Sequence, residues 1–133
     1  MTFTLYGVEY PFKFSLGAMK SFKEKTGKCM WGTTIKLLRT LSECGGKSPL
    51  HTICALGDVL DFHDSAYFLY LIAKEGDSKV DLSAIQDGMI HAGMMPSEDG
   101  LKHPYQLVMA DVSKKVFDYQ QQIASEKKPQ AVS

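Results

Sequence analysis

Residues 2–14 read T-F-T-L-Y-G-V-E-Y-P-F-K-F, and this stretch decides how the fold begins. Phe3 and Leu5 alternate with polar residues, and a period of two places apolar side chains on one face of a strand. Gly7 can take the positive φ of a tight turn, and Pro11 lacks the N–H that a central strand needs. We therefore expect a hairpin over residues 2–14, whose second strand is an edge strand with three aromatic residues on one face: Tyr10, Phe12 and Phe14.

The next segment, from Ser15 to Thr26, has the pattern of one amphipathic helix. Ser15 can cap its first turn, and Gly27 can end it. Three apolar residues recur at helical spacing and are predicted to face the core: Leu16, Met19 and Phe22.

Apolar residues at helical spacing predict further helices along the rest of the chain. One begins at Thr33 or Thr34 and ends at Gly45-Gly46, with an apolar stripe of Ile35, Leu38 and Leu41, to which Leu37 adds. The others run from Pro49 to about Gly57, from Asp61 or Asp64 to Gly76, from Leu82 to about Met94, and from Pro104 to about Ala124. The sequence thus predicts a mainly α fold of about six helices with a small N-terminal β-hairpin, in one domain over residues 1–124. Residues 125–133 are predicted to form a flexible tail.

The opening segment resembles that of the tail assembly chaperones of long-tailed (siphovirus) bacteriophages. The hairpin carries the element Gly7-Val8-Glu9-Tyr10, and Phe12 to Lys28 reads F-K-F-S-L-G-A-M-K-S-F-K-E-K-T-G-K. These residues match a "hydrophobic-T/S-L-G-A" helix start and a "K-T-G-K" helix end of that family. The resemblance is specific over about the first 30 residues and general in length and pattern beyond them.

This resemblance implies a non-enzymatic protein with no catalytic residue and no cofactor. Its implied partners are the tape-measure protein, which it would bind and solubilise, and the tail tube protein, which it would help to recruit. It implies the host cell cytoplasm during infection, and absence from the mature virion. Self-association is left open, and so is a longer form made by frameshifting.

Composition points away from several other classes of protein. The chain has 15 basic and 15 acidic residues, so bulk charge gives no reason to expect a nucleic-acid partner. No apolar run approaches the roughly 18 residues of a membrane span. Three cysteines without a dense framework indicate reduced thiols in a cytosol.

An alternative from a different class is a small helical phosphohydrolase that uses a His-Asp pair and a divalent metal. His63-Asp64 supplies the pair, with His51 upstream and Asp111 downstream. Imidazole and carboxylate suit a metal that activates water. Asp64 also fits a helix cap, however, which needs only a short acceptor side chain. We therefore favour the cap and predict no metal site.

Two smaller motifs are assigned structural roles. Gly45-Gly46-Lys47-Ser48 resembles part of a phosphate-binding loop, but Leu41 stands where the motif needs its first glycine. We predict a helix end followed by a Ser-Pro helix start. Cys44 and Cys54 are predicted to be small core residues, and Cys29 to lie in a turn.

A partner-binding surface is predicted at the methionines near the Pro96 loop. Met89, Met94 and Met95 cluster there, and Met109 follows in the next helix. Thioether side chains adapt to varied apolar partners, which suits a protein that holds another in solution. The candidate partner-binding residues are therefore Met89, Met94 and Met95.

Overall fold

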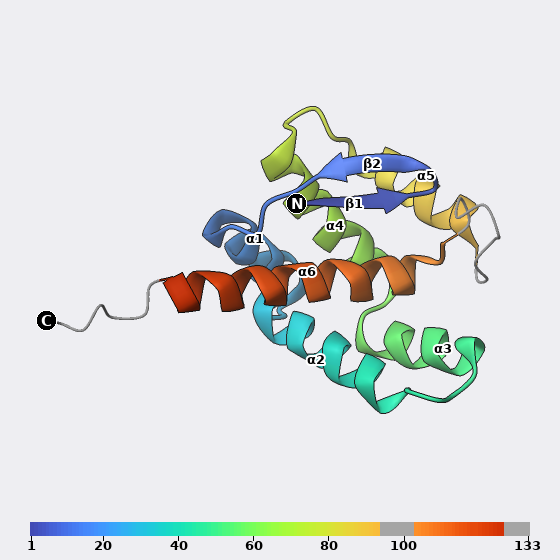
Figure 1. The fold of residues 1–133 in the computed structure, drawn as a ribbon. Helices are drawn as coiled ribbons and strands as arrows, with labels where there is room; N and C mark the ends of the chain where they lie inside the picture. Colours follow the sequence, from blue (N-terminus) through green and yellow to red (C-terminus); the bar gives the residue numbers. More distant parts are fainter. Residues whose placement is uncertain (94–102, 127–133) are drawn as a thin grey trace, which may run out of the picture.

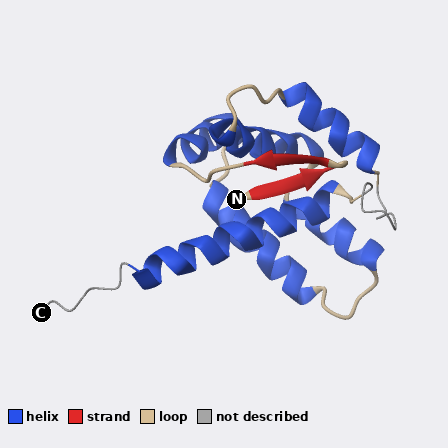
Figure 2. Cartoon of the chain, turned by 45° about the horizontal axis from the view of Figure 1, so that its top comes forward, coloured by secondary structure: helices blue, strands red, loops and turns tan. Residues whose placement is uncertain are grey.

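The computed structural model describes residues 1–93 and 103–126, which form an N-terminal hairpin followed by six helices (Figures 1 and 2). This arrangement confirms the predicted mainly α fold with a minor β part. The elements are β1 (Thr2–Leu5), β2 (Val8–Pro11), α1 (Leu16–Thr26), α2 (Met30–Glu43), α3 (Pro49–Val59), α4 (Phe62–Gly76), α5 (Leu82–Ala92) and α6 (Tyr105–Glu126).

The hairpin pairs β1 with β2 in antiparallel register, with Phe3 opposite Tyr10 and Leu5 opposite Val8. Phe3 and Leu5 are 1% exposed, so the predicted alternation in β1 is confirmed. The turn uses two residues with positive φ, 47° at Tyr6 and 80° at Gly7, as type I′ hairpin turns require. The sequence had indicated only the glycine.

The second strand ends at Pro11, earlier than predicted. Phe12 lies beyond the strand but is still buried, because its N–H donates to the Met1 carbonyl at 2.9 Å and its ring packs 5.7 Å from Phe3. Phe14 is only partly buried and faces Trp31.

Helix α4 lies behind the hairpin and supplies the centre of the core (Figure 1). Five of its apolar residues are fully buried: Ala66, Phe68, Leu69, Ile72 and Ala73. Its cap is Asp61, the first of the two candidates, which accepts the Asp64 N–H at 2.8 Å, so the assignment of Asp64 as the cap was wrong.

The hairpin is fixed to α4 by backbone contacts at the end of that helix. The Lys13 N–H donates to the Ile72 carbonyl at 3.1 Å. At Gly76, an added Cβ would lie 2.6 Å from the Pro11 carbonyl carbon and 2.9 Å from the Phe12 nitrogen. Only glycine allows the strand to approach the helix this closely.

We predict that Gly76→Ala lowers the free energy of unfolding by about 1–3 kcal/mol, because the methyl group meets backbone that no rotamer change can move. The matched control is Gly57→Ala in α3, whose added Cβ would meet nothing closer than 3.8 Å. There the substitution should stabilise by about 0.5–1 kcal/mol through helix propensity. Urea denaturation of both variants measures the difference, and equal effects would contradict the close approach.

Helix α1 begins and ends as predicted. The Ser15 hydroxyl accepts the Ala18 N–H at 3.1 Å, and Gly27 closes the helix with φ 76°. Its inward face differs from the prediction, however, because Ala18 and Phe22 face the core while Leu16 is 82% exposed.

Helix α2 begins earlier than predicted, at Met30. Its cap is Cys29, whose sulfur accepts the Gly32 N–H at 3.4 Å, and both Thr33 and Thr34 lie buried inside the helix. A thiol is an uncommon helix cap, so the sequence favoured the hydroxyl of Thr33 or Thr34 as the cap of α2.

The remaining helix boundaries lie close to those predicted. Ser48 caps α3 with Pro49 at its first position, and Asp81 caps α5. Helix α6 begins after Pro104 and continues through Ser125 and Glu126, slightly past its predicted end. Residues 127–133, most of the predicted tail, lie outside the described residues. Within the described ranges, no helix combines the length and apolarity needed to cross a membrane.

Candidate partner-binding site

The methionine surface predicted from the sequence is not supported where the structure describes it. Met89 is 2% exposed and belongs to the core, so its assignment to a binding surface was wrong. Its flexible thioether is packed in the core and is not accessible to a partner. Met94 and Met95 lie outside the described residues.

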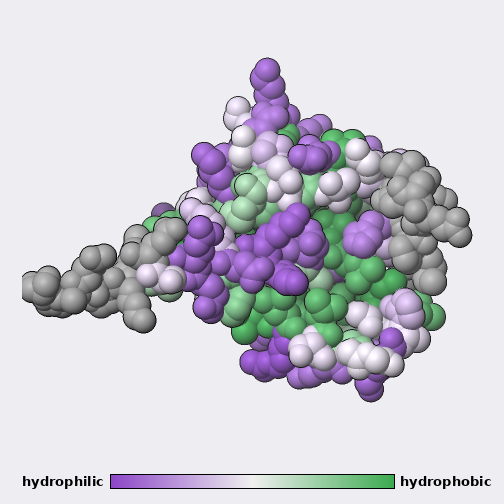
Figure 3. All heavy atoms as spheres, in the orientation of Figure 1, coloured by the Kyte–Doolittle hydropathy of each residue, from purple (hydrophilic) through white to green (hydrophobic). Residues whose placement is uncertain are grey.

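An open apolar groove, lined by partly buried side chains, is found instead between α2 and α6, which pack side by side (Figure 1). Its volume is about 570 Å³. Apolar side chains line it from both helices: Ile35, Leu38 and Leu41 from α2, and Phe117 from α6. Figure 3 shows hydrophobic residues gathered over α2, below the purple residues of α6.

The sequence predicted one apolar stripe of Ile35, Leu38 and Leu41 on α2, with Leu37 adding to the same face. In the structure Leu37, which is 1% exposed, is buried in the core together with Met30 and Thr34, and Leu41 packs partly against that core while it also lines the groove. Helix α2 therefore has two apolar faces, one turned inward and one lining the groove.

A ring stack extends the groove toward α1. Trp31 lies parallel to Phe117, with ring centroids 6.4 Å apart and an interplanar angle of 7°. On its other side Trp31 meets the edge of Phe14 at 6.1 Å. Trp31 thus lines the next hollow along the surface and stacks on Phe117, which lines the groove.

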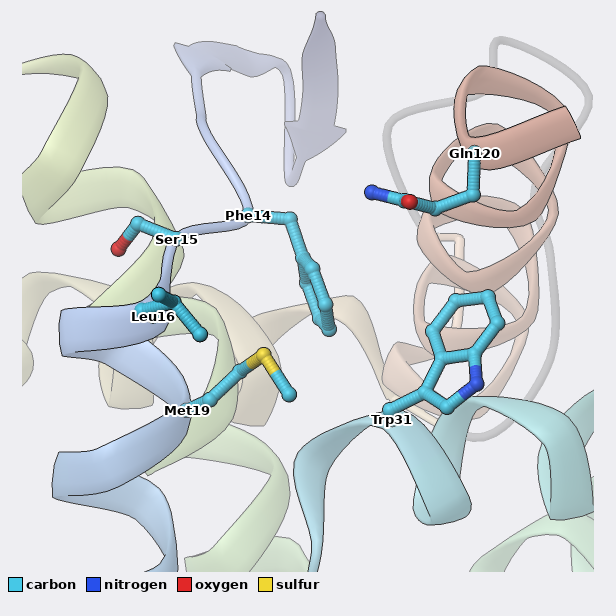
Figure 4. Close-up of a pocket in the computed structure, with 6 residues that line it drawn as sticks. All are labelled: Phe14, Ser15, Leu16, Met19, Trp31 and Gln120. Carbon is cyan, nitrogen blue, oxygen red and sulfur yellow. The ribbon is translucent and has the colours of Figure 1, made fainter. Parts of the chain in front are cut away.

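That next hollow has a volume of about 330 Å³ and collects residues from three helices (Figure 4). Figure 4 shows Phe14 and the Met19 sulfur pointing toward one another, with Trp31 on α2 across from them and Gln120 on α6 above it. Leu16 stands at its open edge. The exposed Leu16, which core packing does not explain, thereby has a place in an apolar hollow that the stack of Trp31 on Phe117 joins to the groove.

We call these two hollows together the α2–α6 surface. It comprises Leu16, Met19, Trp31, Ile35, Leu38, Leu41 and Phe117.

Charged residues border the groove on both helices. Arg39 lies on the α2 side, and Lys114 and Asp118 lie on the α6 side. In residues 1–93 and 103–126 the ion pairs are Lys28 with Asp64, at 2.6 Å, and Lys115 with Asp111, at 3.1 Å. Arg39 and Lys114 therefore have no carboxylate partner in the part of the chain that is described.

The residues considered for a metal site are not brought together. Asp64 lies in the first turn of α4 and pairs with Lys28, while Asp111 pairs with Lys115 on α6. Within the described segments, no three His, Cys, Asp or Glu side chains form a group that could hold a metal ion. The exposed His51 belongs to α3, where its N–H donates to the capping Ser48 hydroxyl at 3.2 Å.

That same hydrogen bond confirms the predicted helix start at Ser48, and α2 ends at Glu43, just before Gly45-Gly46. The cysteine predictions are mixed. Cys44 is buried as expected, whereas Cys54 is exposed on α3 and is not a core residue. All three thiols are free.

Two tyrosines outside the α2–α6 surface have perturbed acidity. Burial raises the pKa of Tyr10 in the hairpin. Burial also raises the pKa of Tyr105 at the start of α6, and the negative charge of Asp61 adds to that rise. Both phenols therefore stay neutral at physiological pH and act as packing groups, Tyr105 against the Phe62 ring at 5.7 Å.

No protein-family model, curated protein or solved structure matched this chain when it was compared with them.

Proposed function

We propose that this protein is a non-enzymatic tail assembly chaperone of a long-tailed bacteriophage. In this proposal it binds and solubilises the tape-measure protein, helps to recruit tail tube subunits, acts in the host cytoplasm and is absent from the mature virion. The resemblance of residues 7–28 supports the choice of family. The observation that carries the binding role is the α2–α6 surface.

A chaperone of this kind needs an exposed apolar surface on a stable scaffold. The α2–α6 surface offers Leu16, which is 82% exposed, and six partly exposed apolar side chains. The helices that carry them are held in the core by Phe22, Leu37 and Val112. A contiguous exposed apolar patch on a monomer commonly marks a site of protein interaction. A groove between two helices suits an amphipathic helix of the partner.

Co-expression with the tape-measure protein encoded by the same phage or prophage tests the proposal. The wild-type chain should raise the soluble fraction of the tape-measure protein and co-purify with it. An unchanged soluble fraction, with this chain well expressed, would overturn the proposed function.

The same proposal predicts that the protein works without a bound metal. Elemental analysis after gentle purification should find no stoichiometric transition metal. His63 lies in the first turn of α4, where Asp61 caps the helix and Asp64 pairs with Lys28. This arrangement gives no reason to expect a bound metal. One equivalent of iron, manganese or zinc that is lost in His63→Ala would contradict the proposal and favour a hydrolase.

A further inference from the structure

The dimensions of the α2–α6 surface define the partner segment that it can hold. Trp31, Ile35, Leu38 and Leu41 follow one another along α2 at spacings of four, three and three residues, which places them on one face. At 1.5 Å per residue, this face is about 15 Å long, or about three turns of a partner helix. A helix laid between α2 and α6 would place its own i, i+3 or i+4 and i+7 residues against this row.

The charged residues at the borders of the groove predict the charge of the partner helix. Arg39 stands on one border and Lys114 on the other, and neither has a carboxylate partner among the described residues. Asp118, one turn after Lys114, is the acidic residue of the groove. The groove therefore carries an excess of positive charge, although the whole chain has 15 basic and 15 acidic residues.

We infer that the α2–α6 surface selects an amphipathic helix whose apolar stripe is bordered by carboxylates on both sides, so that they face Arg39 and Lys114. This inference rests on the proposed function, in which the same surface holds a helix of the tape-measure protein, and it adds the chemistry by which that helix is chosen. Because border charges stay solvated, they discriminate between partners and speed association more than they add affinity.

The test uses two synthetic helical peptides of about 18 residues with the same leucine stripe and no tryptophan. One peptide carries Glu on both borders of the stripe, and the other carries Lys. Trp31 is the single tryptophan of the chain and lies on the surface, so its emission reports binding to the intact protein. We expect the Glu-bordered peptide to bind at least about tenfold more tightly at low salt, with the difference shrinking as salt is added.

Charge reversal supplies the matched comparison. Arg39→Glu combined with Lys114→Glu should invert the preference between the two peptides. Lys25→Glu combined with Lys79→Glu changes the net charge equally at exposed positions that do not line the surface, and should leave the preference as it is.

The outcomes separate this inference from the proposed function. Equal affinity for both peptides would overturn the charge rule. So would an equal change in peptide preference, measured by Trp31 emission, in the Arg39→Glu/Lys114→Glu and Lys25→Glu/Lys79→Glu variants. If the tape-measure protein is solubilised but neither peptide binds, this inference fails while the proposed function stands. If the Glu-bordered peptide binds selectively but the tape-measure protein stays insoluble, the inference holds and the proposed function fails. A dimer of the free protein that Leu38→Asp dissociates would show that a second copy occupies the groove, and would also overturn the inference.

Discussion

Phe12→Ala should lower the free energy of unfolding by about 3–5 kcal/mol, the largest loss of stability that we expect from a change in the hairpin. The side chain is 2% exposed and packs against Phe3, so truncation leaves a cavity between the hairpin and the helices. In a domain of this size the melting temperature should fall by roughly 10–20 °C. Thermal unfolding followed by circular dichroism measures it.

Phe14→Ala is the matched control, because it removes the same atoms two residues away. Phe14 is only partly buried and lines surface hollows, so we expect about half the loss of Phe12→Ala. Its larger effect should be on partner binding, since its ring supports Trp31. Equal destabilisation by the two substitutions, or none by Phe12→Ala, would contradict the different burial of these two rings.

The sequence carried enough information to predict the local structure of most elements. Ser15, Ser48 and Asp81 cap helices where short acceptor side chains were expected, and Gly27 closes α1 in the left-handed region. These signals succeed because each satisfies a backbone group within its own segment. Cys29 shows the limit, since a thiol serves as the cap of α2 where sequence favoured a hydroxyl.

The candidate site was much less predictable. Ile35, Leu38 and Leu41 were recognised as one stripe with Leu37, but the pattern could not distinguish core residues from groove residues, because an apolar stripe indicates only that a face avoids water. Whether the chain itself or a partner covers that face depends on tertiary packing. The sequence did contain one signal. Because Leu37 stands between these residues, the apolar side chains of α2 cover more of the helix than a single core contact needs.

The assignment of Met89 to a binding surface was wrong for the opposite reason. A flexible thioether suits a promiscuous surface and an irregular core equally well, so residue type alone could not distinguish the two. Leu16 was also assigned inward, although the pair Ala18 and Phe22, four residues apart, fixes the buried face of α1.

Leu38→Asp should abolish the effect on the tape-measure protein while the chain folds normally. Leu38 lies in the open groove and not in the buried core, so the carboxylate stays hydrated in the free protein. In a complex the same carboxylate would meet an apolar stripe, which is costly. Loss of one such apolar anchor is worth about 1.5–3 kcal/mol, or roughly 10-fold to 150-fold in affinity, before the cost of the buried charge is added.

Ile90→Asp is the control for this substitution. Ile90 is 63% exposed on α5 and lines neither hollow of the α2–α6 surface, so the same kind of change there should leave activity intact. Unchanged melting temperatures in both variants would confirm that the comparison concerns binding.

The most direct measurement is the soluble fraction of the tape-measure protein co-expressed with the wild type, Leu38→Asp or Ile90→Asp. We predict a high fraction with the wild type and with Ile90→Asp, and with Leu38→Asp a fraction as low as that without any chaperone. Full activity of a normally folded Leu38→Asp variant would contradict the assignment of partner binding to the α2–α6 surface.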